Sequence, residues 1–145
     1  MKYEYDGPRE SASVTRRFDA TPERLFDAWV EPETASKWLF TTITSKAEVE
    51  LDTRMGGSYT ITRRRGGKQY VAVGKYLEID RPRRLVFTFA MPQFAADADT
   101  VIVEIMPDGD GCTLTVTQEG LRPGYATSTV KGWSKMFDAL AQALR

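Results

Sequence analysis

The chemistry open to this chain is limited first by its complete lack of histidine. Without an imidazole it cannot assemble a Ser–His or Cys–His nucleophile. It also lacks a side chain that is common in catalytic zinc and iron sites. The single cysteine, Cys112, cannot form an internal disulfide, and its place in an alternating apolar segment indicates a small buried side chain. We therefore predict neither a metal nor another cofactor.

Acid–base catalysis would then depend on carboxylate, Tyr, Lys or Arg side chains whose pKa is shifted in a dry site. Glu48 and Glu50 share one face of a predicted strand, but it is the face expected to be wet. Asp52 and Arg54 are interpreted as a surface ion pair or as turn residues. No inward-pointing carboxylate pair is predicted on the strands. Binding is therefore favoured over catalysis, and an enzyme without histidine or metal stays open as an alternative.

One basic cluster surrounds a glycine turn, and a second group of charges lies on a later loop. The favoured interpretation of the cluster is a solvated turn, because isolated surface charge contributes little. Attraction of an acidic ligand head group is the alternative, with the later acidic residues expected to offset the cluster. The basic residues are Arg63, Arg64, Arg65 and Lys68, and the acidic ones are Asp97 and Asp99.

The composition is that of a folded domain without a charged partner. Of the 145 residues, 20 are basic and 20 acidic, so the overall charge favours neither nucleic acid nor a membrane surface. A chain of this length can bury one core without disulfides. No apolar run approaches membrane-spanning length, and the polar Met1–Glu10 does not resemble a secretory signal. We expect a cytoplasmic protein with an N-terminal arm at 1–10 and a single domain at 11–145.

The elements that must position any site follow from periodicity. A strand is predicted at 11–18, and Thr21-Pro22-Glu23 is typical of a helix start. A second short helix follows Pro32. From residue 46 the apolar period changes to two, which predicts six antiparallel strands up to about residue 118. A helix is predicted from about 125 to 144, with Gly132 inside it as a sign of close packing or a bend. This order predicts an α+β domain whose curved antiparallel sheet, of about seven strands, has its concave face crossed by the long helix.

Several segments together resemble one known family. These are Phe18–Pro22, Leu25–Trp29, Glu31–Glu33 with Trp38, Asp52–Tyr59, Gly74–Asp80, Arg84–Phe89 and Lys131–Trp133. In this order and spacing they are similar to the homologues of the heat-shock-protein-90 ATPase activator. That family belongs to the START-like (SRPBCC) superfamily, which shares the helix-grip fold of the birch-pollen-type allergens. The resemblance implies a cavity between the long helix and the sheet, and these segments, being mostly packing and turn residues, imply no chemistry.

The same topology predicts which loops surround the mouth of the cavity. Successive hairpins alternate between the two ends of the sheet. The link before the second strand, the turn at 65–68, the loop at 91–99 and the loop at 120–124 therefore share one end. Ligand cavities are mostly apolar with a few placed polar groups. The predicted ligand-binding residues are Trp38, Tyr59, Ile61, Arg63, Phe87, Phe89, Phe94, Val101, Val103, Leu114, Val116, Gln118, Trp133, Met136, Phe137 and Leu140. A filled core is the competing interpretation of the apolar members.

Three functions follow from these observations. The leading hypothesis is a module that binds a small apolar or aromatic molecule. The second is an enzyme acting on an apolar substrate. The third, implied by the resemblance alone, is a co-chaperone that contacts a heat-shock ATPase. No nucleic-acid partner is predicted, and a homodimer stays open because no strand edge or helix face demands one.

Overall fold

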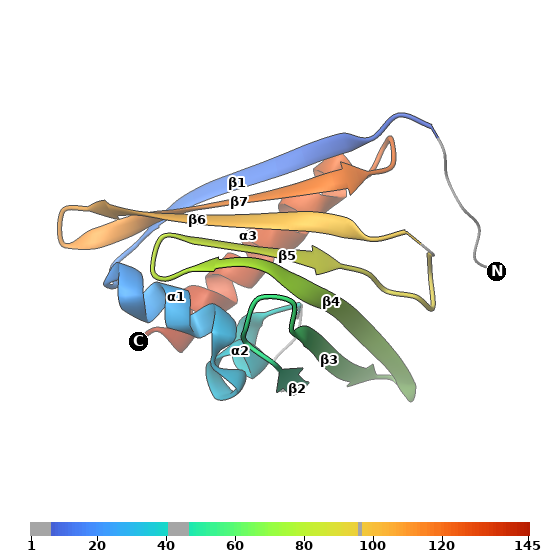
Figure 1. Ribbon diagram of the computed structural model, residues 1–145, viewed down its shortest axis with the longest axis horizontal. Helices are drawn as coiled ribbons and strands as arrows, with labels where there is room; N and C mark the ends of the chain where they lie inside the picture. Colours follow the sequence, from blue (N-terminus) through green and yellow to red (C-terminus); the bar gives the residue numbers. More distant parts are fainter. Residues whose placement is uncertain (1–6, 41–46, 96) are drawn as a thin grey trace.

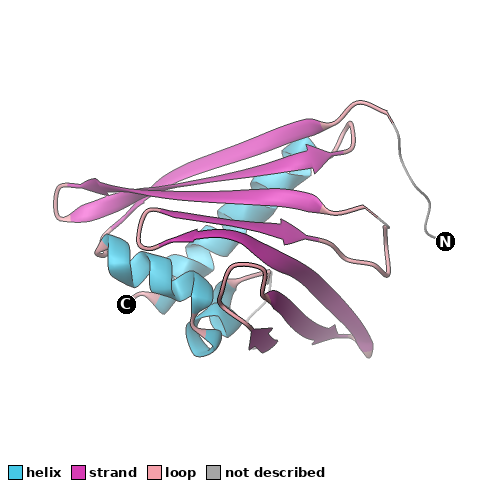
Figure 2. Ribbon diagram, viewed as in Figure 1, coloured by secondary structure: helices cyan, strands magenta, loops and turns pink. Residues whose placement is uncertain are grey.

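The computed structural model describes residues 7–40, 47–95 and 97–145, so the first six residues of the predicted arm lie outside it. Within these residues one antiparallel sheet has the strand order β1-β7-β6-β5-β4-β3-β2. Two short helices follow β1 and a long helix ends the chain (Figures 1 and 2). The elements are β1 (Glu10–Phe18), α1 (Pro22–Val30), α2 (Pro32–Trp38), β2 (Glu48–Leu51), β3 (Ser58–Arg65), β4 (Lys68–Asp80), β5 (Arg84–Phe89), β6 (Asp99–Asp108), β7 (Gly111–Leu121) and α3 (Ala126–Ala143).

The first two helices form where the sequence predicts them. The Thr21 side chain accepts a hydrogen bond from the backbone N–H of Arg24, and Pro22 occupies the first helical position. Helix α2 is then fixed against α1 by Trp38, whose indole Nε1 donates to the carbonyl of Ala28 at 2.9 Å. The rings of Trp29 and Trp38 meet edge to face, 4.6 Å apart. The pair of helices therefore closes one side of the core.

The alternation predicted for the later strands is confirmed. On β7 the side chains of Cys112, Leu114, Val116 and Gln118 are buried, whereas the threonines between them lie on the other face. Thr115 and Thr117 are bonded to Thr15 and Ser13 of β1 at the outer face. One face of the sheet is thus apolar and covered, as expected for an antiparallel sheet packed on one side.

Gly74 lies in β4 where a neighbouring backbone comes very close. A Cβ atom at this position would lie 1.8 Å from the carbonyl oxygen of Thr88 and 2.5 Å from the Tyr59 ring. A glycine inside a strand commonly marks a bulge, but the shift in register of β4 falls between Tyr76 and Glu78. Gly74 is therefore required for close approach, and the irregularity of the strand lies further along it.

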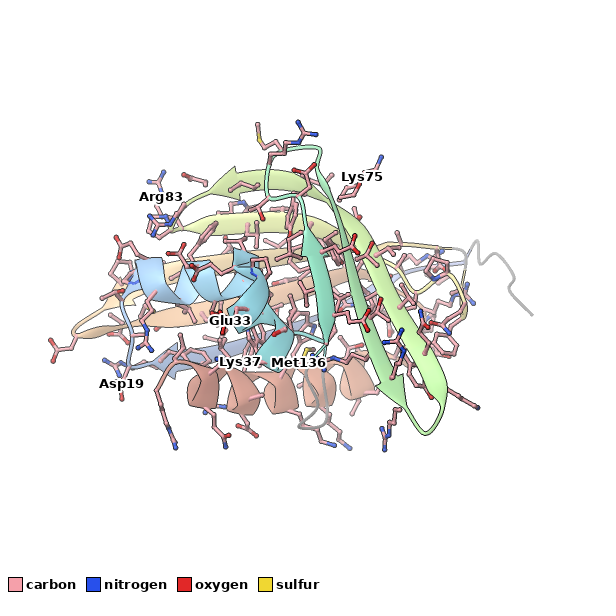
Figure 3. All side chains as sticks on the ribbon, turned by 90° about the horizontal axis from the view of Figure 1, so that it is seen from below. Asp19, Glu33, Lys37, Lys75, Arg83 and Met136 are labelled. Atoms are coloured by element: carbon pink, nitrogen blue, oxygen red, sulfur yellow. The ribbon has the colours of Figure 1, made fainter. Side chains whose placement is uncertain are left out.

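Helix α3 runs across the concave face of the sheet, and α1 and α2 cover the rest of that face (Figures 1 and 3). Trp133, Phe137 and Leu140 of α3 are buried between helix and sheet. The packing around Gly132 is looser than the close packing that the sequence predicted. A Cβ atom added there would meet nothing within 4 Å. The glycine leaves open space beside the helix, and that space leads to the candidate site.

None of the helices in the described part of the chain combines the length and apolar character needed to cross a membrane.

Candidate functional site

The candidate site lies at one end of the sheet, where three connections meet. The β3–β4 hairpin, the β5–β6 connection and the β7–α3 turn share this end (Figure 1). The Gln93 side chain fastens the β5–β6 connection to β4, because it accepts from the Val71 N–H at 2.8 Å and donates to the Gln69 carbonyl at 2.9 Å. These three connections therefore lie at one end of the sheet, as the alternation of hairpins in the sequence predicted.

The first cavity, called here the glycine groove, has a volume of about 220 Å³. It lies between the end of β3 and the start of β4, next to their hairpin, on one side and α3 on the other, with Gly132 in its wall. Figure 3 shows Met136 on the side of α3 that faces the sheet. Its lining is mainly apolar and consists of Phe40, Ile61, Arg63, Tyr70, Ala72, Phe89, Met91, Gly132 and Met136.

The second cavity, called here the polar groove, has a volume of about 420 Å³. It lies between the β5–β6 connection, the end of β7 and the start of α3. Apolar and polar side chains share its lining: Phe89, Ala90, Met91, Phe94, Ala95, Asp97, Asp99, Gln118, Gly120, Leu121, Arg122, Tyr125 and Thr129. Phe89 and Met91 belong to both linings, so the two grooves adjoin at these side chains. A ligand extending past them would contact both.

Between α1 and the sheet there remains only a small void of about 10 Å³, lined by apolar side chains including Trp29 and Phe87. The indole Nε1 of Trp29 has no hydrogen-bond partner among the described residues. A void of this size is at the lower limit for one water molecule. The central core beneath α1 is therefore packed, in contrast to the glycine groove and the polar groove at the end of the sheet.

A hydrogen-bonded chain runs from the core into the polar groove. The Trp133 Nε1 donates to Gln118 Oε1 at 2.8 Å, and Gln118 Nε2 donates to Asp99 Oδ2 at 2.7 Å. An indole N–H can only donate, so it must meet the oxygen of the Gln118 amide. The nitrogen of that amide is thereby directed at Asp99. The orientation of the carboxylate in the groove is thus set by a buried tryptophan.

The two carboxylates of the polar groove have opposite electrostatic environments. Hydrogen bonds from Arg122 and Arg9 lower the pKa of Asp97, with Arg122 Nη2 at 2.8 Å and Arg9 Nη1 at 2.5 Å from its oxygens. Burial raises the pKa of Asp99, and the hydrogen bond from Gln118 opposes that shift. The sequence prediction that Asp97 and Asp99 offset the basic cluster at 63–68 is therefore wrong for Asp97. Its partners are Arg9 and Arg122, whereas Arg64 of the cluster pairs with Glu48.

Arg63 points inward from β3 and is 7% exposed. Its guanidinium donates to the carbonyls of Phe40 at 2.7 Å, Leu39 at 2.9 Å and Ser36 at 3.3 Å. These carbonyls belong to the C-terminal end of α2 and the residues after it, which an intrahelical bond cannot satisfy. Burial lowers the pKa of Arg63 to about 10, so it stays charged at neutral pH. The side chain lines the glycine groove while its donors hold α2.

The predicted ligand-binding residues divide into three groups in the structure. Those that line the two grooves are Ile61, Arg63, Phe89, Phe94, Gln118 and Met136. Tyr59 and Phe87 border the small void instead, and the Tyr59 hydroxyl donates to the Thr88 carbonyl at 2.6 Å. The others are buried in the core and line neither groove: Trp38, Val101, Val103, Leu114, Val116, Trp133, Phe137 and Leu140.

Several groove residues were absent from the predicted set. Met91 and Phe40 were predicted near the mouth but not as ligand contacts, and both line the glycine groove. Tyr70 and Ala72 lie on β4, whose burial pattern alternates too weakly to show which face points inward. Thr129 and Gly132 come from the first half of α3, where small side chains leave room. The signal that could have found them is the glycine within an apolar helix stripe.

The fold and the grooves define a helix-grip protein of the START-like class, in which one long helix crosses a curved antiparallel sheet. The family described as "Activator of Hsp90 ATPase homolog 1-like protein" matches residues 19–145. The chain therefore belongs to that family, which confirms the resemblance drawn from the sequence.

Solved structures of the same fold come from several bacteria. The chain resembles SA2116 of Staphylococcus aureus, a protein of unknown function, with a TM-score of 0.84 at 21% identity, covering 94% of each chain. It resembles CV1439 of Chromobacterium violaceum with a TM-score of 0.79 at 24% identity, covering 91% of this chain and 95% of that one. It resembles Mll3558 of Rhizobium loti with a TM-score of 0.77 at 26% identity, covering 94% of this chain and 97% of that one. No curated protein sequence matches the chain.

Proposed function

We propose that this protein binds a small apolar or aromatic molecule in the glycine groove, against α3, with access through the polar groove. The observation that carries the proposal is Gly132. A glycine inside a helix costs about 1 kcal/mol relative to alanine. Here the missing side chain relieves no clash, since nothing lies within 4 Å of the position of its Cβ. What the glycine provides is open volume in the wall of an apolar groove.

The lining of the glycine groove also suits an apolar ligand. Phe40 and Phe89 present their rings 4.6 Å apart, and Phe40 also contacts Trp133. Met91 and Met136 add flexible, polarisable side chains, which adapt to ligands of irregular shape. Ligand sites are commonly concave and mostly apolar with a few polar groups, and the adjoining polar groove supplies those groups.

The direct test is a thermal-shift screen of apolar and aromatic compounds, with lipids included. A ligand at a hundred times its dissociation constant stabilises a fold by about 2.7 kcal/mol, which is several degrees for a domain of this size. Gly132→Leu should keep the fold but abolish the shift, because its side chain enters the groove. Ser134→Leu adds the same side chain on the exposed side of α3 and is the matched control. If hits persist unchanged in Gly132→Leu, the groove is not the site.

A second candidate, contact with a heat-shock ATPase, is favoured only by the family description. It is tested by asking whether the purified protein changes the ATPase rate of an Hsp90-type chaperone. An unchanged rate would remove this candidate and leave the ligand proposal untouched.

A further inference from the structure

Asp99 lines the polar groove, and the described residues use only one of its two carboxylate oxygens as a hydrogen-bond acceptor. It is half-buried at the start of β6, and its Oδ2 accepts from Gln118 Nε2 at 2.7 Å. Among the described residues, no donor bonds to its second oxygen, Oδ1. That oxygen lies near Gly120, 3.4 Å from the position that a Cβ atom would take there. The carboxylate oxygen thus lies beside Gly120, at a distance where a Cβ atom would make ordinary van der Waals contact.

The neighbouring carboxylate in the polar groove, that of Asp97, accepts hydrogen bonds on both of its oxygens. Asp97 receives Arg122 on both oxygens, at 2.8 and 3.3 Å, and Arg9 on Oδ2 at 2.5 Å. The two arginines nearest the groove are thus held by Asp97, and Arg9 also donates to the Gly120 carbonyl. From the described residues, Asp99 receives only the amide of Gln118. Among the described residues Asp99 Oδ1 is not one of the fully buried atoms that lack a partner, so a donor in the groove can reach it.

The position of this acceptor is fixed before any ligand arrives. Trp133 sets the direction of the Gln118 amide, and Gln118 in turn holds Asp99 Oδ2. Apolar side chains lie around the same groove, including Phe89, Met91 and Leu121. An acceptor held rigidly beside apolar walls selects a molecule that has a hydrocarbon body and a donor at one end.

We propose that the ligand is an amphiphile whose amine or hydroxyl group donates a hydrogen bond to Asp99, while its apolar body lies along Phe89 and Met91. This inference rests on the proposed function, because it assigns the head group of the same ligand. Burial raises the pKa of Asp99, and a donor from the ligand would offset the cost of that burial.

The test compares three probes of similar shape by calorimetry: 2-phenylethylamine, 2-phenylethanol and 3-phenylpropionate. The first two carry a donor, and the third carries a carboxylate that would face Asp99. We expect the wild-type protein to bind the amine and the alcohol at least about tenfold tighter than the carboxylate, the difference made by one charge-assisted hydrogen bond.

Asp99→Asn should abolish this preference. Gln118 Nε2 requires an oxygen opposite it, so the asparagine would turn its amide N–H₂ toward the ligand. The amine should then lose about tenfold in affinity, and the carboxylate should not lose. Asp110→Asn, in the exposed turn between β6 and β7, is the control and should leave all three affinities unchanged.

The outcomes separate this inference from the proposed function. Equal binding of the three probes, or an unchanged ranking in Asp99→Asn, overturns the role of Asp99 and leaves the glycine groove in place. The same holds if no probe binds while other apolar compounds still give a shift that Gly132→Leu abolishes. If no compound of any class stabilises the wild-type protein, both proposals fail.

Discussion

Trp133 donates its indole hydrogen to Gln118 Oε1 at 2.8 Å, and this contact determines which end of the Gln118 amide faces the polar groove. The tryptophan is 2% exposed and lies on α3, whereas Gln118 lies near the end of β7. A residue of the core thereby controls the polarity of the surface that a ligand would meet. The contact joins the helix to the sheet beside the polar groove, which Gln118 lines.

Gly132→Ala should stabilise the protein by about 1 kcal/mol, the difference in helix propensity between the two residues. The added methyl group meets nothing within 4 Å, so no packing penalty opposes the gain. Urea unfolding of the wild-type protein and of Gly132→Ala measures this difference in the free energy of unfolding. A loss of stability would mean that α3 lies closer to the sheet than described.

Arg63→Lys should destabilise the protein by about 2 kcal/mol although the charge is retained. A lysine ammonium cannot reproduce the planar fork that reaches the carbonyls of Ser36, Leu39 and Phe40. At least one buried carbonyl at the end of α2 would then lose its donor, at a cost of about 1 to 3 kcal/mol. Arg64→Lys, on the exposed side of the same strand, is the control and should change little. Equal effects at the two positions would contradict the role given to Arg63.

Acid should weaken the contacts of Asp97. Its folded-state pKa lies below the ordinary value of 3.8, because Arg122 and Arg9 stabilise the charged form. The stability it contributes is therefore complete above pH 3.8 and is lost as the pH falls through the folded-state value. We expect Asp97→Asn to cost about 1 kcal/mol at pH 7 and progressively less below pH 4. Unfolding at a series of pH values checks this, and a penalty independent of pH would contradict it.

The contribution of Asp99 to stability should depend on pH in the opposite direction. Its folded-state pKa is raised, mainly by burial, so the folded state holds the proton more tightly than the unfolded chain. Its charged form consequently costs stability as the pH rises through the interval between the ordinary and the raised value. Asp97, Arg9 and Arg122 are the charged groups around it. Asp99→Asn should therefore be more stable than the wild-type protein at pH 7 and lose this advantage near pH 3. A less stable variant at pH 7 would contradict this sign.

The sequence was sufficient to predict the fold, because an antiparallel sheet repeats one simple signal. Alternation identified the inward faces of β6 and β7 correctly, and Val101, Val103, Leu114 and Val116 are all buried. Of the two interpretations of Asp52 and Arg54, a surface ion pair or turn residues, the ion pair is confirmed, at 2.9 Å. Residue 46, where the strand pattern was predicted to begin, lies outside the described residues.

The site was less accessible to sequence reasoning. Alternation shows that a side chain points inward, but it does not show whether the helix opposite fills the space. Gly132 illustrates this limit, since the same glycine could have permitted close contact or an open groove. Arg63 illustrates another. Its partners are backbone carbonyls 23 to 27 residues away, which no pattern of residue types can reveal.

The binding of a small apolar molecule in the glycine groove is tested most directly by NMR of the methionine methyl groups. Met91 and Met136 line this groove, whereas Met55 and Met106 are exposed, at 68% and 69%, and line neither groove. Single Met→Leu variants assign the signals. With a hit from the thermal-shift screen, we expect the Met91 and Met136 signals to shift together and saturate while those of Met55 and Met106 stay in place. A ligand that stabilises the protein without moving Met91 or Met136 would contradict it.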